Sequence, residues 1–184
     1  RRIHKIKKYV DEIIVIFPFE VEFYKNFNID ARYFGNPLYD LLKNNLTERK
    51  RKRNIISILP GSRSQEVKRN LKQMLEVTNY YPDYKFIVAS TKNMFNLCKN
   101  IIGKNKNIEI VVDQTYSVLK KSKVSIITSG TATLEAALLK TPQIVCYKTD
   151  FLTFYLAKFF LNIKWISLVN ILMRKDLVKE LIQN

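Results

Sequence analysis

Two short loops combine glycine, hydroxyl side chains and one charged side chain in a way that suits phosphate binding. The first loop, residues 60–66, contains Gly61, Ser62 and Arg63. Glycine lets the backbone approach a ligand closely, serine hydroxyls can cap free N–H groups, and the arginine fork matches phosphate oxygens. The loop therefore suits a diphosphate, although a capping box between Ser62 and Gln65, with Arg63 in solvent, explains the same residues.

The second loop, residues 128–137, has small residues around Gly130 and opens a helix pattern. It again offers free N–H groups and hydroxyls. Glu135 could accept two hydrogen bonds from a sugar diol, or it could simply complement the helix dipole. No Gly-Lys-Ser/Thr follows the glycines and no G-x-G-x-x-G is present, which disfavours ATP hydrolysis and hydride transfer. The two loops together favour a nucleotide ligand.

Apolar runs rich in Ile and Val predict the strands that would position these loops. They show little alternation, which is typical of strands buried on both faces. The runs are Ile13 to Phe17, Ile55 to Leu59, Phe86 to Ala89, Ile108 to Val112, Val124 to Ile127, Ile144 to Tyr147 and Trp165 to Val169. Helical stripes lie between them, at Val67, Leu71, Met74 and Leu75, and at Leu134, Ala137 and Leu138. This alternation predicts an α/β fold with a doubly wound parallel sheet, whose ligands bind beyond the carboxyl ends of the strands.

The chain of 184 residues is strongly basic, with 32 Lys and Arg against 16 Asp and Glu and a formal net charge of +16. Such a field attracts nucleic acid, an anionic membrane surface or phosphorylated substrates, although biased residue usage over an ordinary surface is an alternative. A composition break at residues 41–53 predicts an interdomain linker. Its run from Glu48 to Arg53 fits a charged connection or the patch of a basic nucleic-acid-binding α/β module. The run lacks interleaved aromatic residues, which disfavours the second interpretation.

Other chemistry finds little support in the residues. His4 is the single histidine, so a Ser-His-Asp triad or a zinc site is not expected. Cys98 and Cys146 form no disulfide framework and indicate a reducing compartment. No secretory signal or long apolar span is present, and residues 151–161 fit either a membrane-surface helix or a helix between domains. The chain opens without Met inside a helix pattern, so we expect a segment of a longer protein.

Several motifs, read in order, resemble those of the lipid-A-disaccharide synthase family. They are Phe17-Pro-Phe-Glu20 with Phe23-Tyr24, Gly35-Asn-Pro-Leu38 with Asp40, Leu59-Pro-Gly-Ser-Arg63 with Glu66, Ser129-Gly-Thr-Ala-Thr-Leu-Glu135, and Ser167-Leu-Val-Asn170. In this order they cover nearly the whole chain. The resemblance implies an inverting glycosyltransferase with two Rossmann-like halves, of the GT-B type. Residues 1–40 would end the N-terminal domain, and residues 54–184 would form the C-terminal nucleotide-sugar domain, with the chain truncated at both ends.

The family transfers a diacylglucosaminyl group from its UDP carrier to 2,3-diacylglucosamine 1-phosphate, releasing UDP. The resemblance implies donor-binding roles at Gly61, Ser62, Arg63 and Glu66 beside the diphosphate, at Ser129, Gly130, Thr131 and Glu135 for diphosphate and ribose, and at Asn170 facing the UDP. Arg63 would offset charge on the departing UDP. Val169 and Lys148 depart from the Pro and Arg common in the family.

The resemblance also implies partners and a location. The donor and a lipid monosaccharide acceptor would be the substrates, with no cofactor, no metal and no nucleic acid. The protein would be cytoplasmic and peripheral on the cytoplasmic face of the inner membrane, in contact with anionic lipid, and a homodimer is compatible with this. The general base would lie in the N-terminal half, which is largely absent, so this chain alone is expected to be inactive. An α/β domain that has lost its activity is a further alternative.

Overall fold

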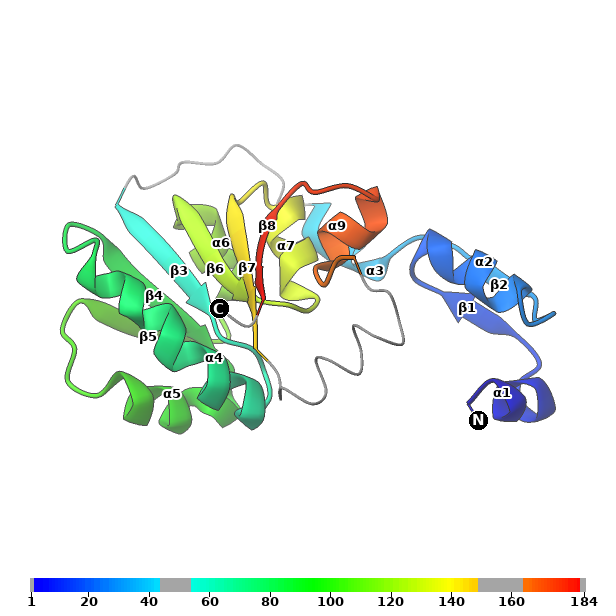
Figure 1. Ribbon diagram of the computed structural model, residues 1–184, viewed down its shortest axis with the longest axis horizontal. Helices are drawn as coiled ribbons and strands as arrows, with labels where there is room; N and C mark the ends of the chain where they lie inside the picture. The colour runs from blue at the N-terminus through cyan, green and yellow to red at the C-terminus, as the bar shows by residue number, and fades with distance from the viewer. Residues whose placement is uncertain (1, 44–53, 149–163, 183–184) are drawn as a thin grey trace. The chain divides into compact units, whose positions relative to one another are not determined.

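The computed structural model describes residues 2–43, 54–148 and 164–182 (Figure 1). The chain divides into two compact units, Arg1–Asn45 and Leu46–Asn184. This division falls inside the linker predicted at residues 41–53. The basic run Glu48 to Arg53 and the apolar stretch 151–161 lie outside the described residues.

The smaller unit consists of α1 (Arg2–Tyr9), β1 (Ile13–Val15), α2 (Pro18–Lys25), β2 (Ala31–Tyr33) and α3 (Pro37–Leu42). The two strands pair in parallel, with Ile13 opposite Ala31. At the start of α2, the Glu20 carboxylate accepts hydrogen bonds from the backbone N–H groups of Ile16 (3.2 Å) and Phe17 (3.0 Å). A proline follows the N-cap, where its missing N–H has no consequence. Part of the Phe17 to Glu20 motif is therefore a helix start.

The larger unit is a six-stranded parallel sheet wrapped by helices. Its elements are β3 (Ile55–Leu59), α4 (Ser64–Glu76), η2 (Val77–Asn79), β4 (Lys85–Ser90), η3 (Lys92–Met94), α5 (Phe95–Ile102), β5 (Ile108–Val112), α6 (Thr115–Lys121), β6 (Val124–Thr128), α7 (Ala132–Leu138), β7 (Gln143–Tyr147), α9 (Leu168–Met173) and β8 (Lys179–Ile182). The strand order is β5-β4-β3-β6-β7-β8. The chain runs outward from β3 on one side and returns to β6 on the other, which is the doubly wound topology predicted from the sequence.

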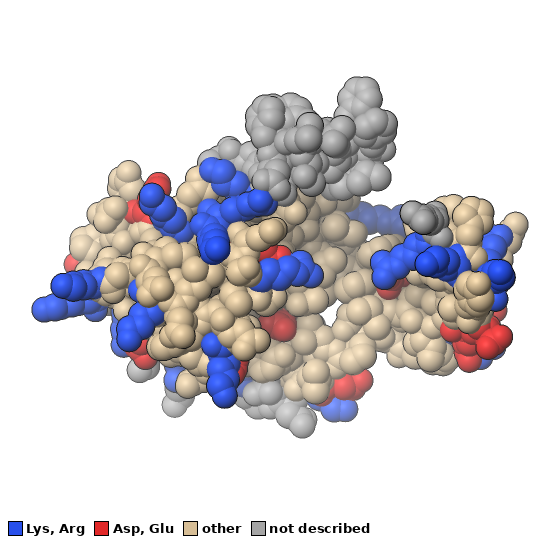
Figure 2. Space-filling model, turned by 90° about the horizontal axis from the view of Figure 1, so that it is seen from below, with Lys and Arg blue, Asp and Glu red and all other residues tan. Residues whose placement is uncertain are grey.

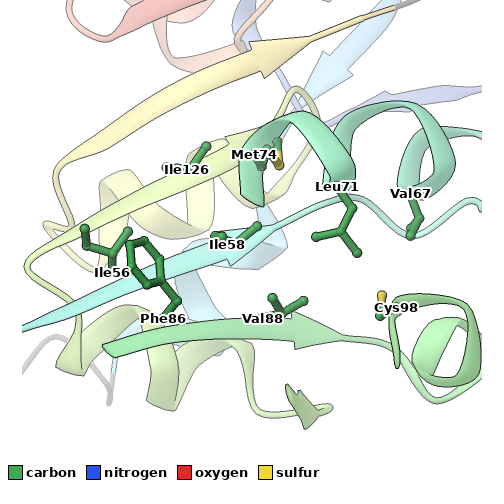
Figure 3. Close-up of a cluster of buried hydrophobic side chains, with 9 residues drawn as sticks. All are labelled: Ile56, Ile58, Val67, Leu71, Met74, Phe86, Val88, Cys98 and Ile126. Atoms are coloured by element: carbon green, nitrogen blue, oxygen red, sulfur yellow. The ribbon is translucent and has the colours of Figure 1, made fainter. Parts of the chain in front are cut away.

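Helices cover both faces of this sheet (Figure 1). On one face, Ile56 and Ile58 pack against Leu71 of α4 and with Cys98 of α5 in the main buried cluster (Figure 3). On the other face, Ile55 packs in a second cluster with residues of β4 and α6. Because successive side chains of β3 are buried on opposite faces, the strand is apolar nearly throughout and shows no alternation.

The predicted strand from Trp165 to Val169 is wrong. The Ser167 hydroxyl accepts a hydrogen bond from the backbone N–H of Asn170 (3.2 Å), and helix α9 begins at the next residue after Ser167. This side-chain cap starts a helix within an apolar segment whose composition also suits a strand. The last strand of the sheet is β8, which the sequence patterns did not predict.

Charged side chains of the described residues are spread over the face seen in Figure 2. On the face shown in Figure 2, Lys and Arg side chains are scattered, with Asp and Glu among them. Of the helices in the described ranges, none is long and apolar enough to cross a membrane.

Candidate functional site

The two predicted loops meet at one edge of the central sheet. Strands β3 and β6 are parallel neighbours, so the loops after Leu59 and Thr128 leave the same edge. A cleft of about 590 Å³ opens between them at the point where the strand order reverses. The residues lining it are Leu59, Gly61, Ser62, Arg63, Glu66, Ala89, Ser90, Thr91, Thr115, Thr128, Ser129, Gly130, Thr131, Ala132, Glu135, Ile166 and Leu168. This is where doubly wound sheets bind ligands.

The start of α4 is closed by a carboxylate and not by a serine hydroxyl. Arg63 is the N-cap residue, and Glu66 Oε2 accepts hydrogen bonds from the backbone N–H groups of Ser62 and Arg63, both at 3.3 Å. The capping box considered between Ser62 and Gln65 is therefore wrong, because the helix begins one residue later than that pairing requires. Glu66 makes the same pair of backbone contacts that Glu20 makes at α2.

Gly61 is required where the first loop turns. Its φ is +107°, a value that side-chain-bearing residues rarely adopt. A Cβ atom placed on Gly61 would lie 2.6 Å from Glu66 Oε2 and 2.9 Å from Glu66 Cβ. Glycine at this position therefore permits both the turn and the close approach of the Glu66 carboxylate, which caps the start of α4.

Arg63 stands at the rim of the cleft with its head group largely in solvent. Its Nη1 forms an ion pair with Glu66 Oε1 at 2.9 Å, and its side chain is 82% exposed. An exposed pair of this kind contributes little to stability. The guanidinium can therefore reorient toward an anionic ligand at small energetic cost.

Two hydroxyls of the second loop, those of Ser129 and Thr133, donate hydrogen bonds to backbone carbonyls. Ser129 Oγ donates to the carbonyl of Ile166 at 2.6 Å, and Thr133 Oγ1 donates to the carbonyl of Gly130 at 2.8 Å. The space around Gly130 is open, since a Cβ atom placed there would meet no atom within 4 Å, and its φ is not positive. The backbone conformation at Gly130 therefore does not require glycine, unlike that at Gly61. Because Gly130 has no side chain, the space beside it in the cleft stays open.

Glu135 connects the cleft to a second cavity of about 480 Å³, lined by Asp113, Gln114, Thr115, Tyr116, Ser117 and Glu135. Burial raises the pKa of the Glu135 carboxyl, and a hydrogen bond from Tyr116 partly opposes this rise. The pKa of Tyr116 is raised by its own burial, by the negative charge of Glu135 and by the same hydrogen bond. The two side chains, from neighbouring helices, therefore interact directly.

Asn170 is not brought together with the other predicted site residues. It is buried, and its amide oxygen accepts from the backbone N–H groups of Leu177 (2.9 Å) and Val178 (3.0 Å). Its amide nitrogen donates to the Val178 carbonyl (2.9 Å) and to Glu180 Oε1 (2.8 Å). All four hydrogen bonds of the amide are made inside the protein, and Asn170 does not line the cleft.

Sequence reasoning missed part of the lining. Ser90 ends β4, Thr91 follows it, and Thr115 opens α6 after β5, so all three lie at the same sheet edge as the two loops. The position of Ser90 and Thr91 directly after the apolar run Phe86 to Ala89 was a usable signal. Ile166 gave no such signal, because it reaches the cleft through a segment fixed by Glu180, whose carboxylate accepts from the N–H groups of Ile166 and Ser167 at 3.0 Å.

Fold and cleft together define a Rossmann-like α/β protein with a cleft at the topological switch point. Comparison with protein families identifies the group more closely. The family model for lipid-A-disaccharide synthetase matches residues 1–184, and the chain belongs to this family. The basic nucleic-acid-binding module finds no support in this match.

Curated relatives carry the same family name. A lipid-A-disaccharide synthase from Colwellia psychrerythraea is 35% identical over 199 residues, covering 100% of this chain and 51% of the relative. One from Blochmanniella pennsylvanica is 37% identical over 199 residues, with the same coverage. The chain thus spans about half the length of these relatives. Among solved structures, UDP-GlcNAc 2-epimerase from Neisseria meningitidis, bound to UDP-GlcNAc, matches with a TM-score of 0.46 and 16% identity over 77% of this chain and 45% of that one.

Proposed function

We propose that the protein is a lipid A glycosyltransferase and that the larger unit is its donor-binding half. The donor would be UDP-2,3-diacylglucosamine and the acceptor 2,3-diacylglucosamine 1-phosphate, joined to give the disaccharide 1-phosphate and UDP. Membership of the lipid-A-disaccharide synthase family supports the reaction class. The general base is not assigned to any described residue.

The observation that carries the donor-binding role is the shared cleft of the β3 and β6 loops. Gly61, Gly130 and Arg63 line it. Backbone N–H groups of small-residue turns at helix starts bind diphosphates in other doubly wound proteins. Arg63, being exposed, would turn from Glu66 to the phosphates and stabilise the charge on departing UDP.

The other carboxylates of the site take different roles in this proposal. Glu66 would hold the first loop in place beside the diphosphate, because its Oε2 already accepts hydrogen bonds from the N–H groups of Ser62 and Arg63. Glu135, which lines both cavities, would accept hydrogen bonds from the ribose diol. Asn170 would act indirectly by fixing the start of α9, and Thr131, exposed at the start of α7, would contact phosphate oxygens.

Calorimetric titration of UDP into the intact protein tests the proposal. Arg63→Ala removes a charge-assisted contact, so we expect UDP binding to weaken by about 1.5–3 kcal/mol. Glu135→Ala should weaken it as well. Lys72→Ala is the matched control, because Lys72 is exposed on the same helix, α4, and does not line the cleft. Equal affinity of wild type, Arg63→Ala and Glu135→Ala for UDP would overturn the assignment.

A further inference from the structure

Tyr116 and Glu135 line a cavity that is separate from the main cleft. Both residues line the cavity of about 480 Å³, whereas only Glu135 also lines the cleft of about 590 Å³. Tyr116 lies in the first turn of α6, and Glu135 lies in the first turn of α7, which packs beside it. Tyr116 therefore lies beside Glu135 and does not line the space that a nucleotide would fill.

We propose that Tyr116 is a positioning residue that holds the Glu135 carboxylate toward the sugar of a nucleotide ligand in the cleft. The inference rests on the proposed function, in which Glu135 binds the ribose diol. A phenol hydroxyl on one oxygen of a carboxylate fixes its rotamer and leaves the remaining lone pairs open to two ligand hydroxyls. Without that bond, a glutamate with several rotatable torsions must be ordered by the ligand itself.

The electrostatics of the pair agree with this role. Burial makes ionisation of Glu135 less favourable, and the hydrogen bond from Tyr116 works in the opposite direction. Tyr116 therefore helps to keep Glu135 charged, which is the form that accepts hydrogen bonds from both ribose hydroxyls. The other charged groups that line the two cavities are Asp113, Arg63 and Glu66.

The test compares UDP with 2′,3′-dideoxy-UDP, which lacks the diol, in calorimetric titrations of the intact protein. Tyr116→Phe keeps the ring and removes only the hydroxyl, so we expect UDP affinity to fall about two- to ten-fold. Affinity for the dideoxy analogue should not change. In Glu135→Gln, adding Tyr116→Phe should cause no further loss of UDP affinity, because the tyrosine acts through Glu135. Tyr80→Phe, at an exposed tyrosine, is the matched control.

A spectroscopic readout separates positioning from a general structural effect. Titration of the Glu135 carboxyl by carbon-13 NMR should show a higher pKa in Tyr116→Phe than in wild type, with Asp113, Arg63 and Glu66 present in both. An unchanged pKa, an unchanged UDP affinity, or equal losses for UDP and the dideoxy analogue would overturn the inference. If wild type binds UDP and its analogue equally well, Glu135 does not bind the ribose diol and the inference is wrong. If wild type binds neither, the proposed function itself fails.

Discussion

Gly61 and Glu66 are in contact across the turn that joins β3 to α4, and the contact leaves no room for a side chain on Gly61. A Cβ atom there would lie 2.6 Å from Glu66 Oε2, the oxygen that accepts the N–H groups of Ser62 and Arg63. The turn, the helix cap and the rim of the cleft therefore depend on one small residue.

Gly61→Ala should lower the free energy of unfolding by about 1–3 kcal/mol, since alanine must adopt a φ near +107°. It should also weaken UDP binding, because the clash displaces Glu66 and the loop that Glu66 holds. Gly35→Ala is the matched control: its φ is also +107°, but no atom lies within 4 Å of the added Cβ. Urea denaturation and UDP calorimetry measure both effects. Wild-type UDP affinity in Gly61→Ala would contradict the account.

Substitution of Glu66 should mainly lower the stability of the protein, whereas substitution of Arg63 should mainly weaken UDP binding. Glu66→Ala leaves two backbone N–H groups at the start of α4 without their acceptor and should destabilise the protein by about 0.5–2 kcal/mol. Arg63→Ala breaks only an exposed ion pair and should cost under about 1 kcal/mol of stability. Glu20→Ala, which removes the equivalent cap from α2, serves as the control and should leave UDP affinity unchanged. A larger stability loss in Arg63→Ala than in Glu66→Ala would show that the cap is misassigned.

Glu135 should make stability depend on pH in a defined direction. Burial raises the pKa of its carboxyl in the folded state, so folding favours the protonated form. Its contribution is fully present below the ordinary glutamate pKa and is lost as the pH rises through the raised value. Glu135→Gln removes this dependence, so the mutant should gain stability relative to wild type between about pH 4 and pH 7. Urea denaturation curves collected across that range measure the difference, and a difference that stays constant with pH would count against the burial effect.

Asn170 is predicted to support the fold rather than to bind the ligand directly. Asn170→Ala leaves the N–H groups of Leu177 and Val178 without their acceptor and should cost about 1–3 kcal/mol. Asn170→Asp should be more harmful at neutral pH, because a carboxylate would then face Glu180. Asn100→Ala, at an exposed position of α5, is the control. Weaker UDP binding by Asn170→Ala with unchanged stability would instead indicate direct contact with the ligand.

Much of the fold was predictable because buried parallel strands leave a strong pattern. The runs at β3, β4, β5, β6 and β7 are largely apolar, and the stripe of Val67, Leu71 and Met74 is buried as predicted. In the other predicted stripe Leu134 is buried and Leu138 is half-buried, but Ala137 is exposed and Ala136 is buried in its place. A short apolar run does not distinguish strand from helix, and at residues 165–169 the Ser167 cap decided for the helix.

The candidate site was predictable at the level of loops but not of individual contacts. Glycine and hydroxyl residues after apolar runs identified both sides of the cleft. The sequence could not show that Glu66 caps the start of α4 or that the Asn170 amide makes all its hydrogen bonds within the protein. Nor could it show that Tyr116 interacts with Glu135. Each of these depends on side-chain direction between elements, which loop composition does not encode.

The central claim is that the cleft between the β3 and β6 loops holds the diphosphate of a UDP donor. A crystal structure of the intact protein with UDP tests it most directly. We expect the two phosphates within hydrogen-bond distance of the backbone N–H groups of Gly61, Gly130 and Thr131, with the Arg63 guanidinium turned from Glu66 toward them. UDP bound elsewhere, with Arg63 still paired to Glu66 and the cleft empty of nucleotide, would contradict the claim.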